Sequence, residues 1–279
     1  MPTKSAPFTG LVEFRPDFSP RPQARLAVFD FDGTLSWLRH GWPDLMCQVF
    51  LPYYPMQPGE SVAEVREILI AEILSGNGRP SIFQMRKFVE RVQARAAKAP
   101  SPEELLQEYQ SRLDKIIAER SDVLLRKAAK ADDFVVFGAR TMLDLLQKRG
   151  FTLFILSGTR EDRVKQEAGL LDLARYFNGQ IFGSPPNASA FSKRAVLDEI
   201  LAREKLHGEH LVCFGDGPVE ILHAKELGGL AVAVASDEDQ HGSGRMDPAK
   251  RAQLIKAGAD VAIPDYRDAA ALIDVLFHE

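Results

Sequence analysis

The sequence predicts an α/β protein with a Rossmann-like, three-layer core, a parallel sheet and an inserted all-helical domain. From residue 132 onward, apolar strand segments alternate with amphipathic helical segments, as in parallel sheets covered on both faces. Between residues 36 and 131 the pattern is almost entirely helical. A short apolar segment, Leu26–Phe29, precedes this stretch and has the composition of a first strand. We therefore expect an N-terminal arm (1–24), a core formed by 25–36 and 132–279, and a helical domain at 37–131.

The composition is that of a globular protein. Of the 279 residues, 45% are hydrophobic and 27% are charged, and the formal net charge is −4. This charge gives no reason to expect nucleic acid or an anionic membrane as a partner, and no apolar run approaches the roughly 20 residues that span a bilayer. Cys47 and Cys213 are far apart, which favours neither a disulfide framework nor a zinc site. We expect a cytoplasmic monomer or homodimer.

The helical domain is predicted from its capping residues. A serine stands three residues before Glu or Gln in three places, each a predicted capping box: Ser61 with Glu64, Ser81 with Gln84, and Ser101 with Glu104. Apolar positions after these sites recur three or four residues apart, as amphipathic helices require. In the N-terminal arm, Leu11–Phe14 can add an edge strand, which the prolines that follow keep short.

The alternation in the C-terminal half predicts the remaining core elements. Helices are expected at Ala139–Arg149, Glu161–Leu173, Ser192–Glu204, Val219–Leu227 and Asp268–Phe277, and strands at Phe151–Leu156, Gly179–Gly183, His210–Phe214, Leu230–Ala235 and Ala259–Ile263. In parallel sheets of this kind, ligands bind beyond the carboxyl ends of the strands.

Two acids, Asp30 and Asp32, directly follow the first predicted strand and precede a Gly-Thr turn. Alternate residues of a strand point the same way, so both carboxylates can face one small volume. Crowded carboxylates repel each other unless a proton or a cation lies between them. The pattern indicates a divalent-metal site or an acid–base site, and a solvated Asp-Gly turn is the alternative.

Two further strand ends carry complementary chemistry. Ser157-Gly158-Thr159 follows a strand and precedes a helix, an arrangement suited to binding an anion. Asp216 follows another strand, with Glu220 four residues later, and such carboxylates are ligands that Mg²⁺ prefers. Lys193 opens a helix between them, where a lysine can neutralise a phosphate oxygen and keep an aspartate ionised.

In this order the motifs resemble those of the haloacid dehalogenase (HAD) superfamily. Asp30-Phe31-Asp32-Gly33-Thr34 matches the first motif, Ser157 the second, Lys193 the third, and Gly215-Asp216-Gly217 with Glu220 the fourth. The helical insertion resembles the superfamily's C1-type cap. The resemblance, to C1-capped phosphatases of the phosphoglycolate phosphatase type, implies the HAD fold. It also implies Mg²⁺-dependent hydrolysis of a small phosphate monoester, such as a sugar phosphate or phosphoglycolate. Many relatives carry aspartate where this chain has Glu220.

The resemblance implies a role for each motif residue. Asp30 is expected to attack phosphorus and form an aspartyl-phosphate, and Asp32 to protonate the leaving group and then activate water. Ser157 and Lys193 are expected to hold the phosphoryl oxygens, and the other substrate-binding candidates of these loops are Gly33, Thr34, Gly158 and Thr159. Mg²⁺ is expected on Asp30, the Asp32 backbone carbonyl, Asp216 and, directly or through water, Glu220.

The residue at position 32 discriminates among the reactions of the superfamily. Dehalogenating relatives lack an acid there, phosphonate-cleaving relatives have a small residue, and ion-pumping ATPases have threonine. Asp32 therefore favours hydrolysis of a phosphate monoester. A phosphomutase shares the same pair of acids and stays an alternative, as does a binding protein that has lost catalysis.

The cap is expected to select the substrate, a small phosphorylated metabolite. Arg39 and His40 are the substrate-binding candidates closest to the first motif, although a surface position is the alternative for each. Trp42 and Asp44 follow them, Asn77-Gly78-Arg79 forms a second candidate loop, and the polar loop 237–244 with His241 is expected at the surface.

Overall fold

A computed structural model describes residues 8–77, 79–185 and 191–278. Its sheet has seven strands in the order β1-β7-β6-β5-β2-β3-β4. The strand β1 pairs antiparallel with β7, and all other neighbouring strands are parallel. The strands are β1 Glu13–Phe14, β2 Leu26–Phe29, β3 Thr152–Arg160, β4 Ile181–Ser184, β5 Leu211–Gly215, β6 Leu230–Val234 and β7 Val261–Ile263. The predicted fold class, α/β with a parallel sheet, is confirmed.

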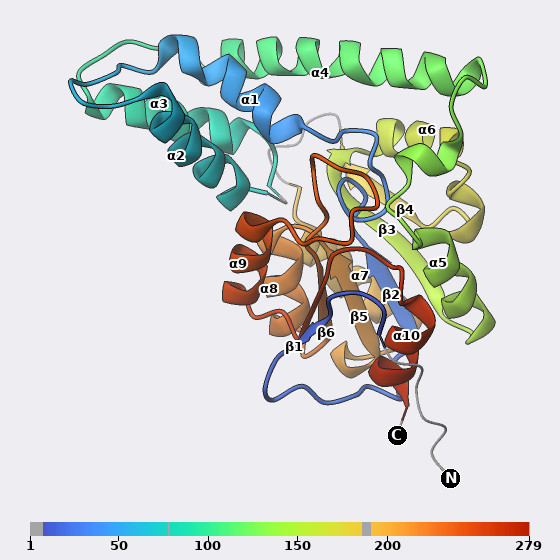
Figure 1. Cartoon of the computed structure of the whole chain (residues 1–279). Coiled ribbons are helices and arrows are strands. Elements are labelled where there is room, and N and C mark those ends of the chain that lie inside the picture. Colours follow the sequence, from blue (N-terminus) through green and yellow to red (C-terminus); the bar gives the residue numbers. More distant parts are fainter. Residues whose placement is uncertain (1–7, 78, 186–190, 279) are drawn as a thin grey trace.

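Helices cover both faces of this sheet (Figure 1). They are α5 Ala139–Lys148, α6 Glu161–Leu170, α7 Lys193–Glu204, α8 Pro218–Glu226, α9 Pro248–Lys256 and α10 Ala269–Phe277. Alternate residues of β2 face opposite layers: Ala27 and Phe29 pack with α5, α6 and α10, and Leu26 and Val28 pack with α7, α8 and α9. Since both faces are covered, β2 is apolar along its whole length.

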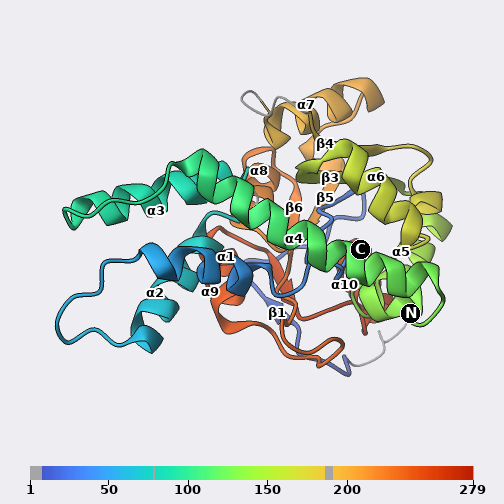
Figure 2. The ribbon, with the colours of Figure 1, turned by 90° about the horizontal axis from the view of Figure 1, so that it is seen from above.

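Four helices between β2 and β3 form a separate layer over the carboxyl ends of the strands (Figures 1 and 2). They are α1 Trp42–Phe50, α2 Val62–Ser75, α3 Ile82–Ala94 and α4 Pro102–Leu125. Short 3-10 helices lie at Leu51–Tyr53 within this layer and at Ala131–Phe134, Ala174–Tyr176 and Gly208–His210 elsewhere in the chain. The four helices have an apolar core of their own, in which Phe50 and Phe88 stack with ring centroids 4.1 Å apart. We call residues 42–125 the helical insertion. The exact boundaries proposed for the arm, the core and the cap stay a prediction.

Three local expectations need correction. Ser81 makes no capping hydrogen bond, because its backbone is already helical (φ −56°, ψ −21°), whereas Ser61 and Ser101 form the predicted capping boxes. The strand β3 continues past Leu156 to Arg160 after a shift of its register with β4, so Ser157 lies within the strand. The helix α9 was not predicted from the sequence.

The described part of the N-terminal arm lies against the core. Asp268 accepts hydrogen bonds from the backbone amides of Thr9 (2.8 Å) and Gly10 (2.7 Å), and β1 forms the expected short edge strand. Residues 1–7 lie outside the described residues. None of the helices described is both long and apolar enough to cross a membrane. The cytoplasmic location stays a prediction.

Candidate active site

The sequence-predicted acids lie at adjacent strand ends in the middle of the sheet. Asp30 directly follows β2, and its backbone amide donates to the Phe214 carbonyl of the neighbouring β5 (2.9 Å). Asp216 directly follows β5. Because β2 lies between β5 and β3, groups from all three strands meet at the edge that the helical insertion covers.

Asp30 and Glu220 share the ammonium group of Lys193. The Lys193 Nζ donates to Asp30 Oδ1 at 2.7 Å and also contacts Glu220 Oε1, and all three side chains are buried. Burial raises the pKa of Asp30 well above its usual range; Lys193 opposes this rise, and Glu220 and Asp216 add to it. Burial disfavours the charged form of Lys193, but Asp30 and Glu220 outweigh it and raise the pKa of the lysine. When both carboxyl groups are ionised, the single ammonium between them leaves this cluster negative.

A second buried lysine holds Asp216. Lys250 of α9 places Nζ 3.0 Å from Asp216 Oδ2, and it also contacts Glu238 in the loop after β6. Burial raises the pKa of Asp216 to about 6; Lys250 opposes the rise, and Glu238 and Glu220 favour it. The sequence reasoning missed Lys250, although Asp247-Pro248 is a recognisable helix start: Asp247 accepts from the Lys250 amide, and proline occupies the first turn.

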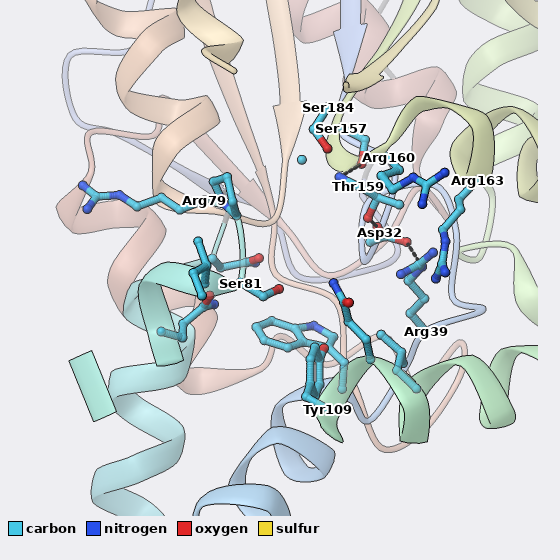
Figure 3. Close-up of a pocket in the computed structure, with 18 of the residues that line it drawn as sticks. Asp32, Arg39, Arg79, Ser81, Tyr109, Ser157, Thr159, Arg160, Arg163 and Ser184 are labelled. Atoms are coloured by element: carbon cyan, nitrogen blue, oxygen red, sulfur yellow. Dashed lines mark hydrogen bonds and ion pairs between the residues drawn. The ribbon is translucent and has the colours of Figure 1, made fainter. Parts of the chain in front are cut away.

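Asp32 is held from two sides. The hydroxyl of Thr159 donates to Asp32 Oδ2 (2.8 Å), and Arg39 Nε lies 3.2 Å from Asp32 Oδ1 in an ion pair without hydrogen-bond alignment (Figure 3). The same guanidinium forms two hydrogen bonds with Glu167 of α6. Arg39 is only 9% exposed, so the alternative of a surface position is wrong. Burial disfavours its charged form, but Asp32 and Glu167 raise its pKa above the usual value.

His40, the other candidate from this segment, does not line the cavity described below. Its ring stacks on Trp37 with centroids 3.6 Å apart, Nδ1 lies 2.8 Å from the Trp37 carbonyl, and Nε2 lies 2.9 Å from Arg120 Nη2. These contacts anchor the segment that enters the helical insertion. His241, expected in a surface loop, packs against Trp37 as well, and its Nε2 lies 2.7 Å from the Val135 carbonyl.

Gly33 and Thr34 belong to the loop that carries Asp30 and Asp32, on its side away from the cavity. Gly33 has φ +73°, and a Cβ built on it would lie 2.1 Å from Asp216 Oδ2, so glycine lets this loop approach Asp216. Thr34 is fully buried. Neither residue lines the cavity in the described part of the chain, whereas Ser157, Gly158 and Thr159 do.

A cavity of about 340 Å³ lies between the strand ends and the helical insertion. Asp30, Asp32, Arg39, Ser157, Thr159 and Lys193 form its floor, and Trp42, Asn77, Ser81, Gln84, Tyr109 and Gln110 belong to its roof. Arg160 and Arg163 lie at one side of it, whereas the side chain of Arg79 points away from this group (Figure 3). Arg163 pairs with Asp114 of α4 and Arg160 with Asp162. Asp44 pairs with Arg66 and is not among the lining residues, and Gly78 lies outside the described residues.

The two buried clusters together suit a divalent cation. Asp30 and Glu220 contact Lys193, and Asp216 and Glu238 contact Lys250. Four ionised carboxylates beside two ammonium groups leave an excess of two negative charges. Asp216 Oδ1 is buried and has no hydrogen-bond partner among the described residues, so an oxygen ligand is available. Within the described ranges no three acids, histidines or cysteines are arranged as a ready metal site, and the two lysines lie between the carboxylates. The donor set fits a hard cation, which Asp30 and Asp216 would hold.

Comparisons with solved structures show the same fold. The chain is similar to a predicted phosphoglycolate phosphatase from Haemophilus somnus (13% identity, TM-score 0.57, covering 88% of this chain and 96% of that one). It is similar to a haloacid dehalogenase-like protein of unknown function from Agrobacterium tumefaciens (16% identity, TM-score 0.61, covering 90% and 97%). It is also similar to a hydrolase from Pseudomonas syringae (14% identity, TM-score 0.58, covering 90% and 98%).

No curated protein matches the chain. The family model of haloacid dehalogenase-like hydrolases matches residues 24–228, which is most of the chain and includes the four motifs. The family expectation and the expectation of an enzyme are therefore confirmed. This protein belongs to the haloacid dehalogenase-like hydrolases.

Proposed function

We propose that the protein is a Mg²⁺-dependent phosphatase that hydrolyses a small phosphate monoester through an aspartyl-phosphate. One observation carries the proposal: two differently held aspartates, Asp30 and Asp32, line the floor of one cavity beside Lys193 and Ser157. A nucleophile and a proton carrier need different surroundings, and these two carboxylates have them.

Asp30 is the nucleophile. Lys193 holds Oδ1, which fixes the carboxylate and favours its ionised form, and Asp30 attacks the phosphorus of the bound ester. The ammonium of Lys193 and the Ser157 hydroxyl bind the oxygens of the phosphoryl group, where negative charge is concentrated in the transition state. A bound Mg²⁺, held by Asp30 and Asp216, supplies electrostatic stabilisation of the phosphoryl group.

Asp32 moves the protons. It protonates the departing alkoxide oxygen, and in the second half of the reaction it takes a proton from the water that hydrolyses the aspartyl-phosphate. Thr159 and Arg39 hold its two oxygens, so the carboxyl group keeps its direction toward the cavity. This preorganisation supports the role because proton transfer depends on geometry first.

The roof of the cavity supports a small, polar substrate. A volume of about 340 Å³ suits a metabolite, and the roof carries amide and hydroxyl side chains, which suit hydroxyl or carboxyl groups of a substrate: Asn77, Ser81, Gln84, Gln110 and Tyr109. The name of the H. somnus structure, a predicted phosphoglycolate phosphatase, agrees with this size class. The proposal includes a small phosphorylated metabolite as the partner and involves neither nucleic acid nor a membrane. It also includes a monomer or homodimer as the oligomeric state.

The test compares p-nitrophenyl phosphate turnover by the wild type and by Asp30→Asn, each with Mg²⁺ and with EDTA. We expect turnover only by the wild type with Mg²⁺, because removal of the nucleophile leaves no route to the covalent intermediate. Asp144→Asn, a change of the same kind on the exposed side of α5, serves as the control and keeps full activity. Turnover that survives EDTA, or that survives Asp30→Asn, contradicts the mechanism.

A second arm addresses the phosphomutase alternative. The wild type is incubated with a hexose phosphate, with and without the matching hexose bisphosphate, and products are followed by ³¹P NMR. A phosphatase releases inorganic phosphate in both samples. Isomerisation that requires the bisphosphate and releases no phosphate would replace the present proposal with a mutase.

A further inference from the structure

Lys250 and Glu238 form a buried ion pair that the proposed chemistry does not use. Lys250 lies on α9 and Glu238 lies in the loop that follows β6, and their side chains are 1% and 11% exposed. Lys250 also lies 3.3 Å from Ser236 Oγ, whose hydroxyl donates to the Gly33 carbonyl (2.7 Å). The pair is therefore packed directly behind the acidic loop.

Lys250, but not Glu238, contacts one oxygen of Asp216, and the other oxygen makes no hydrogen bond to the described residues. Nζ of Lys250 is 3.0 Å from Oδ2 of Asp216, whereas the buried Oδ1 has no hydrogen-bond partner among the described residues. A cation on Oδ1 would consequently lie close to the positive charge of Lys250. Two positive charges this near repel each other appreciably even in a polar environment.

Glu238 is held in place from its other side. Its Oε2 accepts a hydrogen bond from the Gly41 amide (3.1 Å), while Oε1 contacts Lys250. Gly41 is the N-cap of α1, the helix with which the helical insertion begins. Glu238 therefore remains beside Lys250 and offsets its charge.

We propose that Lys250 and Glu238 are positioning residues that set the divalent-cation affinity of Asp216. Lys250 opposes cation binding by its charge, and Glu238 favours binding because it neutralises Lys250. The inference rests on the proposed function only in assuming that Asp216 holds the cation. It assigns a task to two residues that lie outside the four motifs.

The test is a double-mutant cycle measured by calorimetric titration of the apo-protein with MgCl₂ and with MnCl₂. Glu238→Gln keeps an acceptor for the Gly41 amide but leaves Lys250 unneutralised, so affinity falls by about tenfold or more. Lys250→Met removes the repelling charge, so affinity rises by a similar factor. The double variant returns close to the wild-type value, because both charges are gone. Lys256→Met, on the exposed side of the same helix, is the matched control and leaves affinity unchanged.

The opposite signs separate this role from a structural one. A pair that served only to hold the loop would weaken cation binding in both single variants, and that result overturns the inference. Should Lys250→Met unfold, Lys250→Gln, which also removes the charge but keeps a polar side chain, takes its place, and an affinity that does not rise then rejects the inference. If the wild type binds neither cation, the Mg²⁺ requirement of the proposed function fails together with the inference.

Discussion

Gly33 is the residue at which the acidic loop passes closest to Asp216. Its φ of +73° belongs to the left-handed region, and no space exists for a Cβ because Asp216 Oδ2 would lie 2.1 Å away. Two separate requirements, conformation and contact, thus fall on one residue. The contact matters for function because it fixes the carboxylate that is proposed to bind the cation.

We predict that Gly33→Ala lowers kcat/KM by about a hundredfold, because the new methyl group displaces Asp216 from its working position. Gly59→Ala is the matched control: Gly59 has φ +91°, and nothing lies within 4 Å of its built Cβ. Both variants bear the backbone strain of roughly 1–2 kcal/mol, which thermal unfolding measures. Equal activity in the two variants would show that the contact with Asp216 has no functional weight.

At the scale of single elements, helix starts are fixed by local hydrogen bonds. Ser101 has an extended backbone (ψ 155°) and accepts from the Glu104 amide (3.3 Å), whereas the helical turn before α3 begins at Pro80, whose carbonyl accepts from the Phe83 amide (3.0 Å). In α3, Gln84 donates instead to the Ile73 carbonyl of α2 (3.4 Å). The Ser-x-x-Glu/Gln motif thus caps α4, whereas in α3 its glutamine binds the neighbouring helix α2 instead.

Substitution of these two serines tests the difference. Ser101→Ala is expected to lower the free energy of unfolding by about 1 kcal/mol, because the Glu104 amide loses its partner. Ser81→Ala is expected to change it by much less, since the Ser81 side chain makes no capping bond. Urea denaturation followed by circular dichroism measures both, and equal losses would contradict the assignment of the caps.

The N-terminal arm gives a prediction on pH. Burial raises the pKa of Asp268, but hydrogen bonds from the Thr9 hydroxyl and amide and from the Gly10 amide outweigh it, so the pKa lies below the ordinary 3.8. A carboxyl group with a lowered pKa stabilises the fold above its unfolded-state pKa, and this contribution is lost as the pH falls through the folded-state value. Between about pH 5 and pH 3 the wild type should therefore lose more stability than Asp268→Asn. Thermal unfolding at several pH values measures this, and parallel curves would show that Asp268 does not hold the arm.

At the scale of the whole molecule, the buried apolar residues form three clusters, two of which meet at α4, where Ile117 packs against both. Two lie on the faces of the sheet, and the third lies within the helical insertion, where Phe50 and Phe88 stack. Hydrogen bonds tie the layers together, among them Arg120 Nη1 to the Leu38 carbonyl (2.5 Å) and Gln253 Nε2 of α9 to the Ala71 carbonyl of α2 (3.4 Å). Leu124 of α4 belongs to the core beside β2, so the end of this helix is shared, whereas most of the insertion packs on its own core and can lose stability without the sheet.

Phe88→Ala should destabilise the insertion by about 3–5 kcal/mol, because it removes a buried ring and leaves a cavity. Hydrogen exchange should then increase across 42–125, while the amides of β2, β5 and β6 keep their protection. Phe177→Ala, in the core beside β2, is the comparison and should loosen the sheet layer. A uniform increase across both layers after Phe88→Ala would show that they unfold as one unit.

The sequence by itself determined the order of the elements and the places of Asp30, Asp32, Lys193 and Asp216 beside strand ends or helix starts. Periodicity, capping and turn chemistry act over a few residues, so they can be read locally. The family follows from the same motifs, since they keep their order along the chain.

Only the tertiary structure decided how the charges are paired. Arg39 and Glu167 are separated by 128 residues, and Asp30 and Lys193 by 163, yet each pair is buried together. Lys250 reaches Asp216, and Glu238 reaches Lys250, because β5 and β6 are neighbours and α9 packs beside them, which no local pattern specifies. The physical reason is that a buried charge is stable only beside a partner, and folding, not sequence proximity, selects that partner.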